Sequence, residues 1–237
     1  MVTRVAMWSG PRNISTAMMR AWGSRTDCQV VDEPFYAYYL DRTGLAHPGR
    51  ADVLASQPVD WRVVVAELTH GAVPDGAAVV YQKHMTHHLL PEVDRSALTG
   101  LRHAFLIRSP DEVVASYARV RDEPTVSDLG FAQQLELFLR FGGPVVDARD
   151  VLERPGPMLR ALCAALAVPY DDAMLSWPAG PRPTDGVWGR HWYAGVWAST
   201  GFAPYRAVTA ALPDRLAAVA EMCRPYYDAL VAHRLRG

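Results

Sequence analysis

Short apolar runs alternate along the chain with longer segments in which apolar residues recur at the spacing of a helix. The runs predict strands over residues 3–8, 29–32, 77–82, 103–107 and 144–146. The longer segments predict helices over residues 16–24, 61–70, 111–121, 128–141, 157–167, 204–211 and 214–233. Strands that alternate with helices are typical of a parallel sheet covered by helices. We therefore expect an α/β fold of three layers, with a central, mostly parallel sheet flanked by helices.

The size and composition of the chain favour one domain over residues 1–237, with a proline-rich and then aromatic loop at about 178–202 before the last helices. Half of the residues are apolar, which is enough for a core without disulfides or metal sites. The formal net charge of −1 excludes a general electrostatic footprint for duplex nucleic acid or an anionic membrane. We expect neither of these partners, and the sequence leaves a homodimer open.

The compartment is indicated by the N-terminus and by the cysteines. The first residues lack the apolar segment and the cleavage site of a signal peptide. Cys28, Cys163 and Cys223 are far apart and form no pair with the spacing of a zinc knuckle. These features predict a cytoplasmic protein with reduced cysteines.

Residues 9–16 lie between a predicted strand and a predicted helix, which is the setting of a phosphate-binding loop. The start of the helix offers free N–H groups, Ser15 and Thr16 add hydroxyl donors, and Arg12 adds a fixed charge. The alternative is a plain turn in which Ser15 caps the helix. The loop departs from a Walker A motif, because Thr16 stands at the lysine and Ala17 at the magnesium-binding hydroxyl. This departure weighs against an ordinary kinase or ATPase.

A second strand end has the same arrangement. Arg108 follows the strand predicted at 103–107, Pro110 can begin the next helix, and Ser116 lies eight residues beyond Arg108. Arg108 and Ser116 can contact one phosphate if the loop folds back over the helix start, although a capped helix explains the segment equally well. Two anion sites at the carboxyl edge of one sheet suit a nucleotide that carries phosphates at both ends of its ribose.

These two segments resemble the sulfotransferases that use 3′-phosphoadenosine 5′-phosphosulfate (PAPS). Residues 11–16 are similar to the family's 5′-phosphosulfate loop, P-[KR]-S-G-[ST]-T, except that Asn13 and Ile14 replace its Ser-Gly pair. Residues 107–117 are similar to its 3′-phosphate motif, with the same Arg-to-Ser spacing, and residues 145–163 resemble the strand and helix that follow. The resemblance implies a P-loop-like fold, direct in-line transfer of a sulfuryl group, and no metal requirement.

The resemblance also implies which residues bind the nucleotide. The residues that match its two motifs are Pro11, Arg12, Asn13, Ser15, Thr16, Arg108 and Ser116. The aromatic, basic segment at 186–197 resembles the lid that many members fold over the nucleotide, and Arg190 is its candidate contact. Packing of its three tryptophans into the core is the alternative interpretation.

Sulfuryl transfer needs an aligned nucleophile, positive charge at the transferring oxygens, and a base for the acceptor. Arg12 is the candidate for the charge. Glu33 follows the second strand, where several carbohydrate and small-molecule members of the family have a glutamate base, and Asp32 is its rival. The alternative is that one carboxylate caps the following helix and the other is solvated. Aromatic residues at 35–39 either pack in the core or line an apolar acceptor site.

The chain has one lysine, Lys83, and 23 arginines. Lys83 and His84 follow the strand predicted at 77–82, so we expect them in the same cleft. Lys83 can contact the sulfuryl group or the acceptor, and His84 is a second candidate base. His84, His87 and His88 have no carboxylate or cysteine at a ligand spacing, so we expect no metal.

Three functions remain open on these observations. The first is an enzyme that moves a sulfuryl group from PAPS to a hydroxyl or amine of a small-molecule acceptor. The second is a P-loop phosphotransferase that uses ATP. The third is a non-catalytic nucleotide-binding or partner domain of the same fold, which Ile14 in place of glycine favours.

Overall fold

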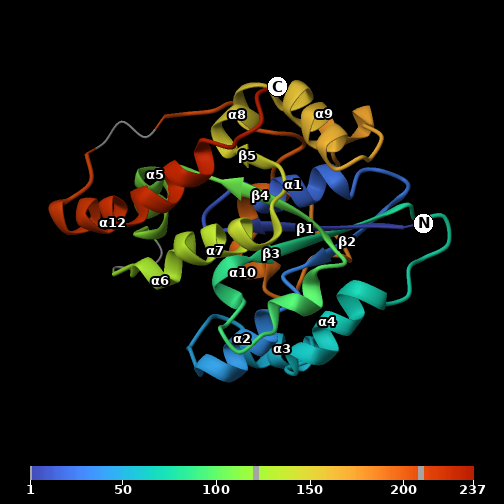
Figure 1. Ribbon diagram of the computed structural model, residues 1–237, viewed down its shortest axis with the longest axis horizontal. Coiled ribbons are helices and arrows are strands. Elements are labelled where there is room, and N and C mark those ends of the chain that lie inside the picture. The colour runs from blue at the N-terminus through green and yellow to red at the C-terminus, as the bar shows by residue number, and fades with distance from the viewer. Residues whose placement is uncertain (1, 120–122, 208–210) are drawn as a thin grey trace.

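A computed structural model describes residues 2–119, 123–207 and 211–237. Its sheet has five parallel strands in the order β2-β3-β1-β4-β5 (Figure 1). The strands are β1 (Thr3–Ser9), β2 (Cys28–Asp32), β3 (Val79–Met85), β4 (Arg102–Ile107) and β5 (Val145–Asp147). Residues 5–9 of β1 are fully buried, because helices cover both faces of the sheet. All five predicted strands are therefore present, and the predicted three-layer α/β fold is confirmed.

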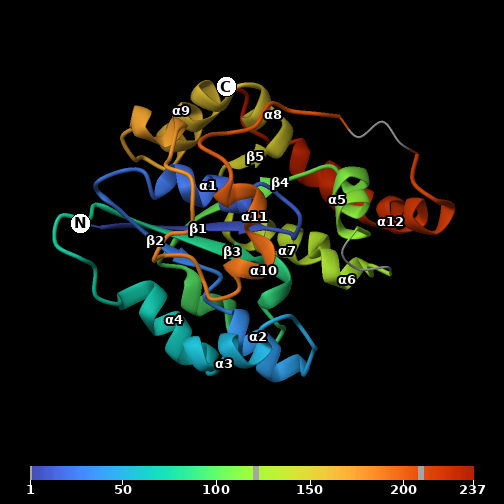
Figure 2. The same ribbon diagram turned by 180° about the vertical axis from the view of Figure 1, so that it is seen from behind.

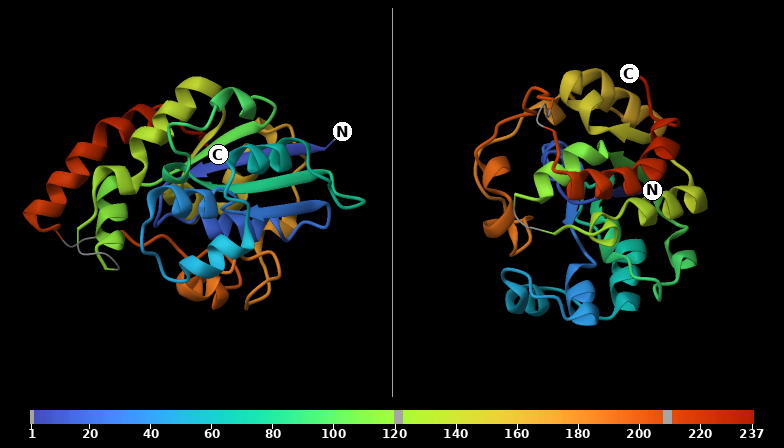
Figure 3. Two further views of the ribbon diagram at one scale, coloured as in Figure 1. Left: turned by 90° about the horizontal axis from the view of Figure 1, so that it is seen from below. Right: turned by 90° about the vertical axis from the view of Figure 1, so that its left-hand side faces the viewer.

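One face of the sheet packs against α1 (Ser15–Trp22), α8 (Ala148–Glu153) and α9 (Pro155–Ala165). The other face packs against α4 (Trp61–His70), α7 (Phe131–Phe141) and α12 (Asp214–Val231). The aromatic segment, residues 186–197, lies on the α1 side, with its short helices α10 (Gly189–Trp192) and α11 (Ala194–Trp197) in front of the sheet in Figure 2. Figure 3 shows α12 and the aromatic segment on opposite sides of the sheet.

Shorter elements surround these layers. Near the carboxyl end of β2 lie α2 (Tyr36–Thr43) and α3 (Arg50–Ser56), and β3 leads into the 3-10 turn η1 (Thr86–His88). The remaining elements are η2 (Arg95–Leu98), α5 (Pro110–Tyr117), α6 (Val126–Leu129) and η3 (Asp172–Leu175). Among the described residues, no helix combines the length and apolar character needed to cross a membrane.

Three predicted elements need correction. Strand β3 continues to Met85, because its backbone pairs with β1 as far as Ser9 and its polar residues Lys83 and His84 are buried. The helix predicted at 128–141 is divided into α6 and α7 by Gly130, whose φ of +71° ends the first helix. Of the helix predicted at 204–211, residues 204–207 and 211 are not helical, and 208–210 lie outside the described residues.

Other helices were not predicted. Helix α2 is formed by a tyrosine-rich sequence, and aromatic residues have only modest helix propensity, so its sequence reads as core or site lining. Helices α3 and α8 have seven and six residues, too short for a clear periodic pattern. In contrast, α4 has the predicted bounds, and its N-cap Asp60 accepts a hydrogen bond from the Arg62 N–H.

Candidate functional site

The loop between β1 and α1 leaves the start of α1 open to an anion. Helix α1 begins at Ser15, no side chain among the described residues caps it, and its first turn carries no acidic residue. The first-turn N–H groups and the helix dipole therefore favour a negative group at this end. Asn13 fixes the loop, because its Nδ2 donates to the Leu106 carbonyl at 3.0 Å and its Oδ1 accepts from the Ile14 N–H at 2.8 Å.

The backbone of this loop does not need a glycine at Ile14. Ile14 has a φ of −87°, which any residue adopts, and the left-handed residue is Arg12, with a φ of +57°. Gly10 is the position where a side chain would not fit, since a Cβ would lie 2.6 Å from the Leu129 carbonyl oxygen. The departure from the family's glycine at Ile14 therefore leaves the loop intact.

The loop between β1 and α1 (residues 9–16) and the segment from the end of β4 into α5 (residues 107–117), called the anion loops below, contact each other directly. The Arg12 Nε donates to the Ser116 Oγ at 3.1 Å, and the Arg108 Nη1 donates to the Arg12 carbonyl at 2.8 Å. Gly10, Pro11, Asn13 and Arg108 also line one narrow hollow. Segments about a hundred residues apart in the sequence thus form one cationic site.

The charge of this site is only partly balanced. Arg108 pairs with Glu112 at 3.0 Å, and Glu112 also accepts from the Tyr205 hydroxyl at 2.6 Å. Burial, and the positive charges of Arg108 and Arg119, lower the pKa of Arg12. Among the described residues, three guanidinium groups lie beside one carboxylate, and this excess of positive charge is what a phosphate requires.

A second, buried cluster lies on β2 and β3. Lys83 is 1% exposed, and its Nζ donates to the Asp32 Oδ1 at 2.9 Å, to the Tyr193 hydroxyl at 2.7 Å and to the Glu33 Oε1. The Tyr193 hydroxyl donates to Asp32 at 2.8 Å, and the Gly186 N–H donates to the Asp32 Oδ2 at 3.0 Å. The structure therefore brings Asp32, Glu33 and Lys83 together, with the aromatic segment packed against them.

The backbone of Glu33 is held in an uncommon conformation, with a φ of +39°. Its N–H donates to the Lys83 carbonyl at 2.9 Å, and its carbonyl accepts from the Gln57 Nε2 at 3.2 Å. Burial raises the pKa of Glu33, and so does Asp32, while Lys83 acts in the opposite direction. Burial alone would lower the pKa of Lys83, but the two carboxylates outweigh burial and raise it.

The structure separates His84 from Lys83. Side chains alternate along a strand, so His84 points to the opposite face of the sheet, where its ring stacks on Trp8 at 4.2 Å and contacts Gln82 at 3.2 Å. Burial lowers the pKa of His84 to about 3. His84 therefore has the surroundings of a neutral core histidine.

A different histidine lies beside Glu33. His88 follows β3 in η1, and its Nδ1 is 3.9 Å from the Glu33 Oε2. Its ring stacks on Tyr36 at 4.6 Å and on Tyr39 at 4.7 Å, and within the described ranges its Nδ1 has no hydrogen-bond partner. The sequence pattern indicated His88 only as a possible metal ligand, although its place just after a strand end is a signal for a role at this edge of the sheet.

The aromatic segment is held against the rest of the protein by buried tryptophans and by hydrogen bonds. Trp188 is buried, and the Trp197 Nε1 donates to Asp185, whose carboxylate also forms a buried ion pair with Arg20 at 2.6 Å. Arg190 is exposed and contacts Asp52 and His191. These contacts are with α3 and with its own helix, so the structure does not bring Arg190 to the anion loops.

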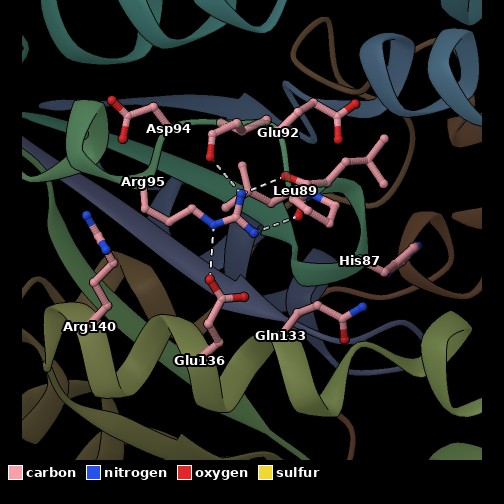
Figure 4. A pocket seen from close by; sticks show the side chains of 11 residues that line it. His87, Leu89, Glu92, Asp94, Arg95, Gln133, Glu136 and Arg140 are labelled. Atoms are coloured by element: carbon pink, nitrogen blue, oxygen red, sulfur yellow. Dashed lines mark hydrogen bonds and ion pairs between the residues drawn. The ribbon is translucent and has the colours of Figure 1, made fainter.

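A pocket of about 430 Å³ lies between α7 and the segment from η1 to η2 (Figure 4). Arg95 supports its wall by donating to the carbonyls of Leu89 and Val93 and to the Glu136 carboxylate (Figure 4). His87 lines the pocket, and its ring centroid is 4.4 Å from that of His88. The volume is in the range of small-molecule sites, which is about 300–1,000 Å³.

The described residues contain no group of three or more His, Cys, Asp or Glu side chains arranged to hold a metal ion. In particular, His84, His87 and His88 do not form such a group. His84 lies in the Trp8 stack and His88 in the stack with Tyr36 and Tyr39.

The chain is similar to solved sulfotransferase structures. It superposes on the sulfotransferase domain of the Synechococcus PCC 7002 olefin synthase with a TM-score of 0.57 and 18% identity, covering 100% of this chain and 98% of that one. With the sulfotransferase domain from the curacin biosynthetic pathway the TM-score is 0.53 and the identity 15%, over 94% of this chain and 98% of that one. With a sulfotransferase from Alicyclobacillus acidocaldarius the TM-score is 0.55 and the identity 12%, over 99% of this chain and 98% of that one. These similarities confirm the P-loop-like fold.

Two curated relatives are similar in sequence. Branched-chain-amino-acid aminotransferase-like proteins 1 and 2 of Arabidopsis thaliana are 33% and 30% identical over 231 residues, which are 95% of this chain. These residues are 41% of each relative, so the chain spans about two-fifths of their length. The model of the sulfotransferase domain family matches residues 3–234, and the chain therefore belongs to that family.

Proposed function

We propose that the chain transfers a sulfuryl group from PAPS to a hydroxyl or amine of a small-molecule acceptor in the cytoplasm. The observation that carries this proposal is the contact between the two anion loops, in which Arg12 bonds Ser116 and Arg108 bonds the Arg12 carbonyl. This contact makes one cationic site from two strand ends, as a nucleotide with phosphates on both sides of its ribose requires. Membership of the sulfotransferase family supports transfer of a sulfuryl group rather than a phosphoryl group.

The two ends of the nucleotide are assigned to different groups. The open start of α1, with Ser15 and Thr16, takes the 5′-phosphosulfate, and Arg108 with Ser116 takes the 3′-phosphate. Arg12 bonds Ser116, so its charge lies on the 3′ side in this arrangement.

Glu33 is the proposed base. The acceptor oxygen or nitrogen attacks the sulfur, its proton passes to Glu33, and the sulfur–oxygen bond to the 5′-phosphate breaks. The electron pair of that bond leaves with adenosine 3′,5′-bisphosphate. One carboxylate oxygen of Glu33 is bonded to Lys83, so the proton goes to the other oxygen, which faces His88.

The pocket beside η1 is the proposed place of the acceptor. Its carboxylates Glu92, Asp94 and Glu136 suit a molecule that carries hydroxyl or amino donors. His87, in the pocket wall, contacts His88, and His88 lies beside Glu33. The pocket wall is thus linked to the second Glu33 oxygen through His87 and His88.

Thermal unfolding with three nucleotides tests the donor assignment. Adenosine 3′,5′-bisphosphate without metal should raise the Tm, and at a hundred times its Kd the stabilisation is about 2.7 kcal/mol. AMP should raise the Tm less at the same concentration. A rise only with ATP and magnesium would favour a phosphotransferase instead, and bisphosphate binding without turnover of labelled PAPS would favour a non-catalytic domain.

A further inference from the structure

The only lysine of the chain has no donor left for a substrate. A lysine ammonium carries three N–H donors. In the structure these three contacts are with Asp32, Glu33 and the Tyr193 hydroxyl. Lys83 is 1% exposed, so it does not meet solvent or a ligand without breaking one of the three.

The partners of Lys83 are themselves fixed from three directions. Asp32 accepts from the Gly186 N–H at 3.0 Å, and the Tyr193 hydroxyl accepts from the Trp188 Nε1 at 3.0 Å. Glu33 is fixed through its backbone by Gln57 and by the carbonyl of Lys83. Strand β2, strand β3 and the aromatic segment therefore converge on one ammonium group.

The shape of the cluster explains why this position is a lysine in an arginine-rich chain. A compact ammonium can direct three donors to three separate oxygens, whereas the guanidinium of arginine is a flat fork that suits paired oxygens in one plane. The three acceptors of Lys83 come from two consecutive residues at the end of β2 and from a segment 110 residues away along the chain.

We propose that Lys83 is a positioning residue, which holds the Glu33 carboxylate ionised and directed toward the acceptor, and is not a ligand of the transferred sulfuryl group. Tyr193 supports Lys83 in this role, so the aromatic segment serves the base as well as covering the sheet. This inference rests on the proposed function of Glu33.

The groups that face Glu33 have effects of opposite sign. Lys83 and Tyr193 favour its ionised form, whereas Asp32 opposes it by like charge. His88 faces the same carboxylate, and burial, together with the neighbouring histidines and Lys83, lowers the pKa of His88, so its neutral form is favoured and adds no charge. Removing Lys83 should therefore make Glu33 harder to ionise, and removing the charge of Asp32 should make it easier.

The experiment measures kcat/KM against pH for three variants. Lys83→Met should move the acidic limb of the profile to higher pH and lower kcat/KM at neutral pH by about 10–100-fold, since less of the base is ionised. Tyr193→Phe should move the limb in the same direction by less, and Asp32→Asn should move it to lower pH. The Kd for adenosine 3′,5′-bisphosphate should stay within about twofold in all three.

The matched control is Tyr227→Phe. It also removes a tyrosine–carboxylate hydrogen bond, of 2.6 Å to Asp147, but at β5, and it should leave the acidic limb unchanged. If Lys83→Met does not fold, Tyr193→Phe and Asp32→Asn still test the inference through their opposite shifts. A loss of kcat at every pH without movement of the limb, or equal shifts from the two milder variants, overturns it.

Failure of the proposed function has a different signature. If the wild-type chain binds the bisphosphate but transfers no sulfuryl group, the proposed activity is wrong. The carboxyl carbon of Glu33 can then be titrated by ¹³C NMR in wild type and Tyr193→Phe. An unchanged titration would overturn the positioning role independently of any activity.

Discussion

The two charged regions at the carboxyl edge of the sheet, the anion loops and the cluster around Lys83, have charge balances of opposite sign. The anion loops place Arg12, Arg108 and Arg119 near one another, and within residues 2–119 and 123–207 Glu112 is the carboxylate that pairs with Arg108. The cluster around Lys83 has two carboxylates for one ammonium and is almost fully buried. The first region therefore has positive charge to offer a ligand, and the second has none.

This difference indicates a division of roles. A site with surplus cations binds anions, whereas a buried cluster with surplus carboxylate repels them and is suited to accept a proton. Each region also contains a non-glycine residue with positive φ. This residue is Arg12 in the anion loops and Glu33 in the buried cluster. Variants that affect only one region should therefore separate nucleotide binding from turnover.

The largest expected effect is on turnover in the buried cluster. Glu33→Gln should lower kcat by about 10²–10⁴-fold, because the glutamine amide cannot accept the proton of the acceptor. Nucleotide affinity should be unchanged, because glutamine has nearly the same size as glutamate and Glu33 is not among the proposed nucleotide contacts. Initial rates and bisphosphate titrations on the same preparation measure both quantities. His84→Asn is the companion variant. If it abolishes turnover while Glu33→Gln stays within a few-fold of wild type, the assignment of the base is wrong.

The next effect is on binding in the anion loops. Arg108→Ala should weaken the binding of adenosine 3′,5′-bisphosphate by about 10–150-fold, since a charged hydrogen bond contributes roughly 1.5–3 kcal/mol. The affinity for AMP, which has no 3′-phosphate, should change little. Isothermal titration with both nucleotides measures the difference. Arg160→Ala, which removes an exposed arginine paired with Asp172 at 2.8 Å, is the matched control. Equal losses for the two nucleotides would remove the 3′ assignment.

The third prediction concerns Gly130, which joins α6 to α7 beside the anion loops. A Cβ there would lie 2.3 Å from the Thr86 Oγ1, and Gly130 has a φ of +71°. Gly130→Ala should lower the free energy of unfolding by about 1–3 kcal/mol more than Gly44→Ala, since overpacking adds to backbone strain. Gly44 has a similar φ of +68°, and a Cβ there would meet nothing within 4 Å. Gly44→Ala therefore measures the cost of backbone strain without overpacking. Urea unfolding of both variants makes the comparison, and equal losses would contradict it.

The smallest effect is the pH dependence of stability from buried histidines. Burial lowers the pKa of His84 to about 3, below the ordinary 6.5, so between these values the unfolded chain binds a proton that the folded chain does not. Stability should therefore fall as the pH falls through this window, by about 1.4 kcal/mol per pH unit from His84. Urea unfolding at several pH values should show a shallower slope in His84→Asn. An unchanged slope in His84→Asn, or an equal reduction in the exposed control His191→Asn, would contradict this.

Much of the framework was predictable from the sequence. All five strands, α4 and the positions of both anion loops follow from apolar periodicity and from the residues at strand ends. The order of the elements also placed Arg108, Ser116 and the loop at 9–16 at one edge, because parallel strands share a carboxyl edge. These features depend on local pattern and on topology, which one sequence carries.

The directions of individual side chains were not predictable in this way. Whether Lys83 faces a ligand or a counter-ion depends on Tyr193, 110 residues later, and the orientation of Arg12 depends on Ser116, 104 residues later. His84 and His88 differ by four positions, yet only His88 lies beside Glu33, because the strand continues past His84 and turns its ring to the other face.

Periodicity and the order of the elements are sufficient to predict the layers of the fold, the edge of the sheet proposed to carry the chemistry and the residue types available there. The tertiary structure alone decided that Arg12 pairs with the second loop, that Arg190 stays with α3, and that Lys83 is saturated by its neighbours. The physical reason is that periodicity records which face of an element is buried. The partner of a buried charge is instead set by whichever distant segment packs against it, and no local pattern encodes that segment.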